Sequence, residues 1–332
     1  MVVCQFRAKE ERRRSYTCTH NTFGSINFSV RHALLHQPGR FRPPLLSGLP
    51  PRRRRVECTG QPGPQDDPRL PPRVADVLQN VRAPVDPLCE TYNFRCIASD
   101  RRGFGSSHWN GPDTKKPVDW DTLLTDVISL LQHLEIQDFI FVAASMGCTE
   151  SLLAYQSSKF IEERCKGLVW LGAIMPFPLQ TAEHPLSPSL ELWDSIVGGL
   201  RDNRAAFVSE SLPGVFAIQA GNEIHPKTLE HFERIVAEAD SLAVVKTVEI
   251  FNQPAEAAVK KLAESAVQIP ILAIHGDADQ GMPLEASAQI VKEMVPWVDL
   301  KVYEKAGHGL YLTHSGQLME DLVSFFRQVE NA

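Results

Sequence analysis

The sequence has no long hydrophobic run, and its cysteines are few and scattered. The longest apolar run covers residues 168–179 and is broken by Pro176 and Pro178, whereas a membrane-spanning helix needs about 20 apolar residues. The seven cysteines are an odd number without a Cys-x-x-Cys pair, and His-Glu-x-x-His is absent, so neither a disulfide framework nor a metal site is expected. Residues 1–14 carry Arg and Glu where a signal peptide has its apolar centre. We therefore expect a cytoplasmic protein without a membrane span.

The sequence also has no overall excess of positive charge, but its charges are unevenly distributed. The net charge of −6 argues against a nucleic-acid partner or an anionic membrane surface. Residues 1–90 nevertheless hold 15 Lys and Arg against 8 Asp and Glu, together with 12 of the 24 prolines. Dense proline removes backbone donors and fixes extended backbone, so neither helix nor sheet can propagate there. We predict that residues 1–85 form a basic, Pro/Arg-rich, mostly disordered arm. Glutamates interrupt its basic character, which favours a solvated tail over a localisation signal at Arg52–Arg55.

Regular secondary structure is expected from about residue 92 onward. Short apolar runs there alternate with stretches whose apolar residues recur at helical spacing. The expected strands are 94–98, 139–143, 168–171, 269–274 and 300–303, and the expected helices are 121–135, 150–158, 285–294 and 316–329. Solidly apolar strands that alternate with helices predict an α/β fold with a doubly wound, mostly parallel sheet. Between about 176 and 262 the alternation lapses, which predicts a helical cap inserted into a domain spanning residues 86–332.

A candidate nucleophile lies where the second of these strands turns into a helix. Ser145 is the centre of the pentapeptide Ala-Ala-Ser-Met-Gly at residues 143–147. A serine in such a strand–turn–helix elbow is held in a strained turn that exposes its hydroxyl, and small residues two positions away let strand and helix approach. The pentapeptide is a relaxed form of Gly-x-Ser-x-Gly. A serine hydroxyl also needs a base, because it is a poor nucleophile at its ordinary pKa.

Two loops further along the chain supply the partners that such a serine requires. His-Gly-Asp-Ala-Asp at residues 275–279 follows one expected strand, and Ala-Gly-His-Gly at residues 306–309 follows the next. Open α/β sheets carry their sites at the carboxyl ends of parallel strands. The order Ser145, Asp279, His308 is the order of nucleophile, acid and histidine that this elbow geometry uses.

From Tyr92 onward the chain resembles α/β-hydrolases, and in particular the cofactor-free, non-haem haloperoxidase-like serine esterases. The matching stretches are 95–106, 143–147, 171–178, 275–287 and 306–314. The resemblance implies a catalytic triad of Ser145 as nucleophile, His308 as general base and Asp279 as the carboxylate that orients it. It also implies the backbone N–H of Met146 as an oxyanion donor and a small carboxylic ester as substrate, with peracid formation in some members. No metal, haem or other cofactor is implied.

Other residues compete for these roles. Asp277 lies two residues from Asp279, but the family's acid stands three residues after the loop glycine, which selects Asp279. His314 lies nearer the closing helix and is interpreted as structural, and His275 is expected to brace the acid loop. Gly103-Phe104-Gly105 lacks the third glycine of a dinucleotide-binding turn.

The sequence departs from the family ahead of residue 94. An α/β-hydrolase has three strands before this point, and the third ends in a His-Gly loop with the other oxyanion donor. The proline-rich arm takes their place, so we expect the sheet to lack its first strands and half its oxyanion hole. Two hypotheses therefore remain open: an esterase acting through an acyl-enzyme at Ser145, and a non-catalytic or impaired hydrolase-like protein that binds a small apolar ligand.

Overall fold

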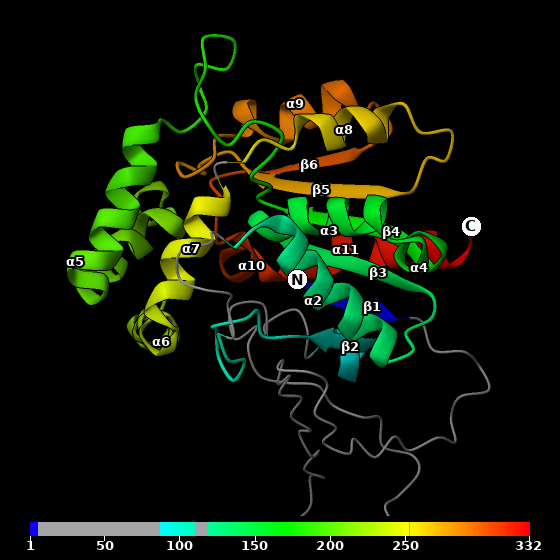
Figure 1. The fold of residues 1–332 in the computed structure, drawn as a ribbon, viewed down its shortest axis with the longest axis horizontal. Coiled ribbons are helices and arrows are strands. Elements are labelled where there is room, and N and C mark those ends of the chain that lie inside the picture. The colour runs from blue at the N-terminus through cyan, green and yellow to red at the C-terminus, as the bar shows by residue number, and fades with distance from the viewer. Residues whose placement is uncertain (6–86, 110–117, 252) are drawn as a thin grey trace, which may run out of the picture.

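The computed structural model describes residues 1–5, 87–109, 118–251 and 253–332. The arm from residue 6 to 86, including the Arg52–Arg55 run, lies outside the described residues. Six strands form one sheet in the order β2-β1-β3-β4-β5-β6 (Figure 1). The strands are β1 (Val2–Gln5), β2 (Arg95–Ala98), β3 (Phe139–Ala144), β4 (Cys165–Leu171), β5 (Ile271–Gly276) and β6 (Asp299–Tyr303). β3 to β6 pair in parallel, as the alternation of strands and helices predicts.

Helices cover both faces of this sheet, and side chains that alternate along each strand fill the two interfaces. The helices of the α/β body are α2 (Trp120–His133), α3 (Met146–Ser157), α4 (Lys159–Arg164), α8 (Glu256–Ala263), α9 (Ala288–Met294), α10 (Leu310–Thr313) and α11 (Ser315–Glu330), with a short 3₁₀ turn, η2 (Leu284–Ala286). Phe139 and Phe141 of β3 pack into one buried cluster with residues of α2, α3, α8 and α9. Ile140 and Val142 point to the opposite face, where α11 covers them. The predicted doubly wound α/β architecture is confirmed.

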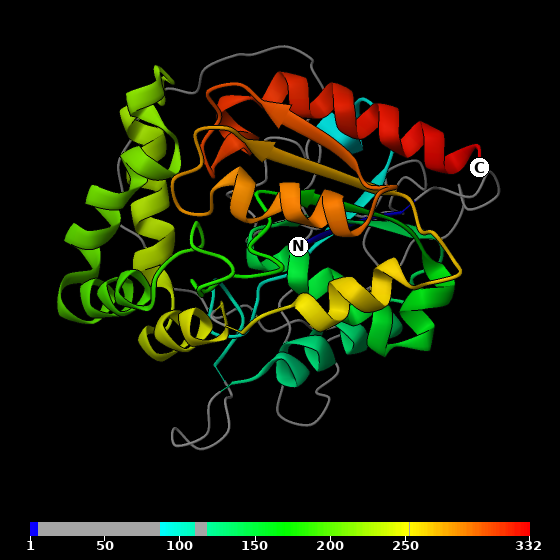
Figure 2. The same cartoon turned by 90° about the horizontal axis from the view of Figure 1, so that it is seen from above.

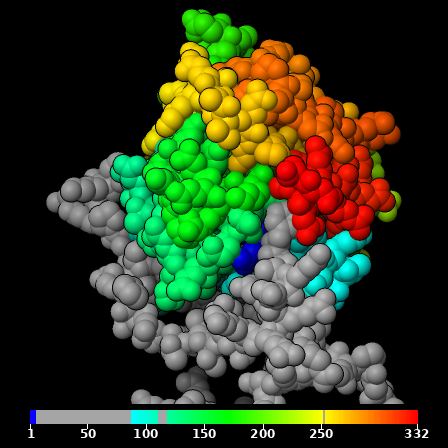
Figure 3. Space-filling view, turned by 90° about the vertical axis from the view of Figure 1, so that its right-hand side faces the viewer, coloured from blue at the N-terminus to red at the C-terminus, as the bar shows by residue number. Residues whose placement is uncertain are grey.

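The strand β1 departs from the expectation of a disordered arm over its first residues. Val2–Gln5 pairs antiparallel with β2 on one side and with β3 on the other, with Val2 opposite Val142. All four of its residues are buried, and a small blue patch of the N-terminal residues is visible in Figure 3. Burying Val2, Val3 and Cys4 between two strands favours the strand although it is only four residues long. Because β1 runs against β3, its first residue lies at the end of the sheet where Ser145 follows β3.

The loop after β2 is fixed to the helices on one face of the sheet. Arg102 makes two hydrogen bonds of 2.6 Å to the carboxylate of Asp126 in α2, and both side chains are buried. Arg101 forms an ion pair with Glu150 in α3. A buried bidentate pair of this kind constrains orientation as well as distance. The loop that leaves the edge strand is therefore held in one position beside the elbow helix.

A helical cap is inserted between β4 and α8, as the lapse in alternation predicts. It consists of α5 (Leu190–Val215), η1 (Ile218–Ala220), α6 (Pro226–Glu238) and α7 (Ser241–Phe251), which stand together to one side of the sheet in Figures 1 and 2. Gly103, in the loop after β2, accepts a hydrogen bond from the N–H of Asp240 at 2.8 Å. A Cβ on Gly103 would lie 2.2 Å from that of Ala243 in α7. This close approach joins the cap to the α/β body on one side of the site.

Candidate active site

Ser145 stands in a strained turn between β3 and α3. Its backbone has φ 56° and ψ −127°. This conformation is unfavourable for any residue that carries a Cβ, and it persists only where the surrounding structure enforces it. The Ser145 N–H donates to the carbonyl of Leu171 in β4 at 2.9 Å, which anchors the turn to the sheet. An added Cβ at Gly147 would meet Ala143 at 3.7 Å and Met1 at 3.9 Å. These are ordinary contacts, so the need for a small residue there is weaker than the motif suggests.

Asp279 is a buried carboxylate whose two oxygens have different partners. Its side chain is fully buried. Oδ1 accepts hydrogen bonds from the N–H groups of Gly281 and Met282, both at 3.0 Å. Oδ2 lies 2.7 Å from Nδ1 of His308. Burial raises the pKa of this carboxyl, but the His308 charge and these hydrogen bonds outweigh burial, so the pKa lies below its ordinary value. Asp279 is therefore a charged acceptor near neutral pH.

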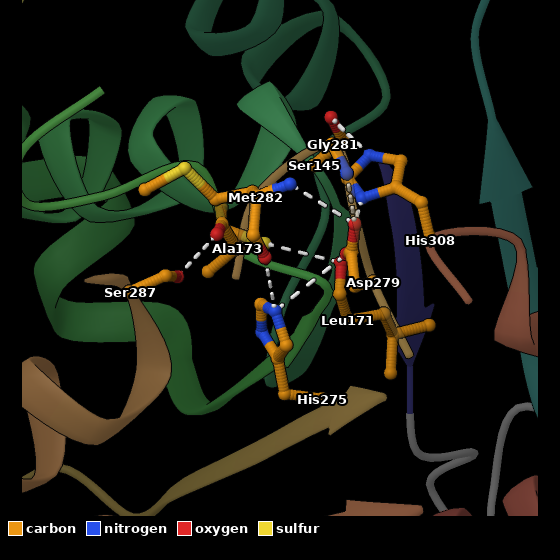
Figure 4. A network of polar contacts seen from close by, with 10 residues as sticks. Ser145, Leu171, Ala173, His275, Asp279, Gly281, Met282, Ser287 and His308 are labelled. Atoms are coloured by element: carbon orange, nitrogen blue, oxygen red, sulfur yellow. Dashed lines mark hydrogen bonds and ion pairs between the residues drawn. The ribbon is translucent and has the colours of Figure 1, made fainter. Parts of the chain in front are cut away.

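His308 links this carboxylate to the serine. Its loop follows β6, and its Nε2 lies 2.9 Å from Oγ of Ser145 (Figure 4). Because Asp279 can only accept, Nδ1 carries a hydrogen and Nε2 can accept the hydroxyl proton of Ser145. Burial disfavours the charged imidazole, but the charge of Asp279 and its hydrogen bond raise the pKa of His308 above the ordinary value. The His308 side chain is 24% exposed, so part of the ring reaches the surface.

Gly172 leaves room for this pair at the end of β4. Its backbone has φ 53°, the left-handed region that glycine adopts without strain. A Cβ there would lie 3.3 Å from Nδ1 of His308 and 3.6 Å from Oδ2 of Asp279. Sequence reasoning placed Gly172 only inside a family-like stretch and did not identify this contact. The signal is a glycine directly after a buried strand.

The competing residues have structural partners. Asp277 Oδ1 accepts from the N–H of Lys305 at 2.5 Å, so this carboxylate joins the acid loop to the histidine loop. His314 lies 3.1 Å from the carbonyl of Glu304 and stacks at a tilt beside Tyr303. Among the described residues, neither side chain forms a hydrogen bond with Ser145.

His275 braces the acid loop, as its position in the sequence predicts. The ring is fully buried, and its Nε2 lies 2.8 Å from the carbonyl of Met282 (Figure 4). Burial lowers the pKa of His275. The neutral ring then donates its Nε2–H to Met282, whose own N–H donates to Asp279. His275 thereby fixes the loop that presents the carboxylate.

Met146, the expected oxyanion donor, directly follows Ser145, whereas the described sheet has no loop for a second donor. Met146 is the first residue of α3, and the first N–H groups of a helix have no partner within it. In the described residues no strand parallel to β3 lies between β3 and β2, because β1 occupies that position in the antiparallel direction. The strand β1 was not predicted from the sequence, since a run of four residues ahead of a proline-rich segment is too short a signal.

The described residues contain no cluster of three or more His, Cys, Asp or Glu side chains arranged to hold a metal ion. Nor does any described helix combine the length and the apolar composition needed to cross a membrane.

The comparison with known proteins agrees with this fold. A sequence profile of the alpha/beta hydrolase fold matches residues 75–315. The chain belongs to the α/β-hydrolase family. This α/β-hydrolase is 30% identical over 241 residues to the non-heme chloroperoxidase CPO-A1 of Kitasatospora aureofaciens, covering 71% of this chain and 83% of the relative. It is 27% identical over 239 residues to the bifunctional esterase/perhydrolase DCH of Acinetobacter calcoaceticus, covering 70% of this chain and 82% of that protein.

A solved structure extends the likeness to three dimensions. The bromoperoxidase from Bacillus anthracis superposes with a TM-score of 0.67 at 26% identity, covering 75% of this chain and 87% of that one. The predicted likeness to haloperoxidase-like esterases is thus confirmed for sequence and for fold. Both comparisons cover most of each relative, so this α/β-hydrolase shares the body of the fold with them.

Proposed function

We propose that this α/β-hydrolase cleaves small carboxylic esters through an acyl-enzyme on Ser145. The observation that carries the proposal is the continuous chain of contacts from Asp279 Oδ2 to His308 Nδ1, at 2.7 Å, and from His308 Nε2 to Ser145 Oγ, at 2.9 Å. Both distances lie in the normal hydrogen-bond range. The three groups come from three loops, so this alignment depends on the fold and not on local sequence.

In the proposed mechanism, His308 accepts the hydroxyl proton while Ser145 Oγ attacks the ester carbonyl carbon. The charge of Asp279 stabilises the imidazolium that forms, and the Met146 N–H donates to the developing oxyanion. Collapse of this intermediate expels the alcohol, which takes the proton from His308. Water then attacks the acyl-enzyme with His308 again as base, and it releases the carboxylic acid and the free serine.

Hydrogen peroxide can replace water in the second half of this reaction. Its attack on the acyl-enzyme would release a peracid and regenerate Ser145, so no electron acceptor or metal is needed. The relative DCH is named as an esterase and a perhydrolase, which supports testing both activities here. We propose ester hydrolysis as the principal reaction and peracid formation as a second outcome of the same acyl-enzyme.

The test is steady-state hydrolysis of p-nitrophenyl acetate, with and without added peroxide. Ser145→Ala is expected to abolish turnover, and His308→Ala is expected to lower kcat by about 10³-fold or more. Peroxide should divert part of the acyl group to peracid, measured by oxidation of a halide or a dye. Turnover that survives in Ser145→Ala would contradict the proposal.

One observation favours a second candidate function. The antiparallel strand β1 occupies the place beside β3, and the described sheet has no loop with a second oxyanion donor. A protein of this kind could bind a small apolar ligand without efficient turnover. Wild-type protein that binds a short ester but neither hydrolyses it nor forms an acyl-enzyme would support this candidate.

A further inference from the structure

The loop that carries His308 is held at Lys305 by two other parts of the chain. The Lys305 N–H donates to Asp277 in the acid loop, and its carbonyl accepts from Nδ2 of Asn222 in the cap at 2.7 Å. Lys305 has φ 60°, a left-handed conformation that a residue with a Cβ keeps only where its surroundings hold it. Acid loop, histidine loop and cap therefore meet three residues before His308.

The Asn222 amide faces three carbonyl groups at this junction. Its Nδ2 lies 3.0 Å from the carbonyl oxygens of Phe216 and Ala217, in addition to that of Lys305. An amide nitrogen has two hydrogens, which these three acceptors share. Ala217 is also in the left-handed region, with φ 48°. The amide thus holds two strained backbone positions, one in the cap and one in the histidine loop.

The same part of the cap packs tightly against the glycines on both sides of His308. The Gly309 N–H donates to the carbonyl of Val215 at 2.8 Å. A Cβ on Gly307 would lie 2.6 Å from the Val215 oxygen, and one on Gly309 would lie 2.3 Å from the ring of Phe216. The backbone of the histidine loop is therefore in direct contact with the end of α5.

We propose that Asn222 is a positioning residue, which holds the His308 loop against the cap and so fixes the imidazole between Asp279 and Ser145. The catalytic consequence rests on the function proposed above. Without the amide, Lys305 and Ala217 can relax to ordinary backbone conformations, and the histidine loop can shift relative to the cap. Hydrogen bonds weaken steeply as their geometry departs from the optimum, so both contacts of the ring would suffer. Asn222 itself does not touch the reacting atoms.

The first experiment measures the ring itself and does not depend on activity. The His308 imidazole is titrated by NMR in the wild type, Asn222→Ala and Asn222→Asp. Asp279 raises the pKa of His308 through a close contact, so loss of that contact should lower the pKa in Asn222→Ala, the variant that adds no charge. Asn203→Ala is the matched control, because the Asn203 side chain accepts from Ala206 within the cap. It should leave the His308 titration unchanged.

The second experiment measures hydrolysis of p-nitrophenyl acetate by the same proteins. We expect kcat to fall at least about tenfold in Asn222→Ala with a smaller change in KM, since misplacement by about 1 Å can cost 10²-fold. Asn222→Gln keeps the amide donors and should retain more of kcat than the isosteric Asn222→Asp. If Asn222→Ala does not fold, the kcat of Asn222→Gln compared with that of Asn222→Asp tests whether the amide donors position His308.

Three outcomes separate the two proposals. A wild-type kcat and a wild-type His308 pKa in folded Asn222→Ala and Asn222→Asp would overturn the role of Asn222 and leave the esterase proposal intact. A wild type without any turnover would overturn the esterase proposal, while the NMR titration still decides the role of Asn222. A lowered pKa together with a lowered kcat supports both.

Discussion

The Asp279→Asn substitution keeps the size of the side chain and removes the charge that contacts His308. Opposite charges in contact near a protein surface attract by about 4 kcal/mol at an effective dielectric of about 20, which corresponds to about 10³-fold in rate. The asparagine amide can also donate to His308 Nδ1, which places the ring hydrogen on Nε2 and blocks the proton transfer from Ser145. In the Ser-His-Asp template the same change costs about 10⁴-fold. We therefore expect kcat to fall by about 10³- to 10⁴-fold.

The assay is hydrolysis of p-nitrophenyl acetate across a range of pH, with Asp277→Asn as the matched control. Asparagine at 277 keeps an oxygen that can accept from Lys305, so kcat should change by no more than about two- to threefold, as for an ordinary surface substitution. Thermal unfolding of both variants shows whether the acid loop has kept its structure. A larger loss of kcat from Asp277→Asn than from Asp279→Asn would refute the assignment of the acid.

Three further predictions concern the pH profile, the space beside the triad and the oxyanion hole. Only the neutral His308 ring can accept the serine proton, and the pKa of His308 is raised, so kcat/KM should rise with pH through an inflection above the ordinary histidine value of about 6.5. Asp279→Asn should move the inflection to lower pH. A wild-type inflection below about 6.5 would be inconsistent with the geometry. Gly172→Ala should destabilise the protein by about 1–2 kcal/mol because residue 172 has a positive φ, and it should lower kcat because the added methyl group crowds His308. The control is Gly281→Ala, whose added Cβ makes an ordinary contact of 3.5 Å and should leave the melting temperature and kcat near the wild-type values. Equal effects of the two substitutions would contradict this reasoning. Loss of one oxyanion donor costs about 10²- to 10³-fold, so turnover of p-nitrophenyl acetate should be at least tenfold slower than that of a family member with the complete second-donor loop, measured beside it. Equal rates would mean that another group supplies the second donor.

Much of the α/β body could be predicted because each signal is local. The apolar runs that became β3, β4 and β5 are buried on both faces, and such strands are continuous in sequence. Glycines and turns mark the loops that carry Ser145, Asp279 and His308, so the order of these residues along the chain sufficed to propose that they meet. The helix after Ser145 begins at Met146, four residues earlier than expected. Its first turn includes Gly147 and Thr149, which are weak helix formers, and tertiary packing decides its start.

The features that escaped prediction depend on contacts between distant segments. Val2–Gln5 becomes a strand because two strands, both at least 90 residues away along the chain, bury it on both sides. Asn222 looks like an ordinary turn residue until the fold brings the carbonyl of Lys305 to its amide. Asp277 competed with Asp279 in the sequence, and its contact with Lys305 appears only once the two loops are adjacent. Such pairings leave no periodic pattern along the chain.

The central claim is that Asp279 and His308 activate Ser145, and labelling by a fluorophosphonate probe tests it most directly. The probe reacts with an activated serine and requires no knowledge of the natural ester. Intact mass should show a single adduct on the wild type, and peptide mapping should place it on Ser145. Ser145→Ala should remain unlabelled, and His308→Ala should label far more slowly than the wild type. A folded wild type that stays unlabelled, or an adduct on any other residue, would contradict the account.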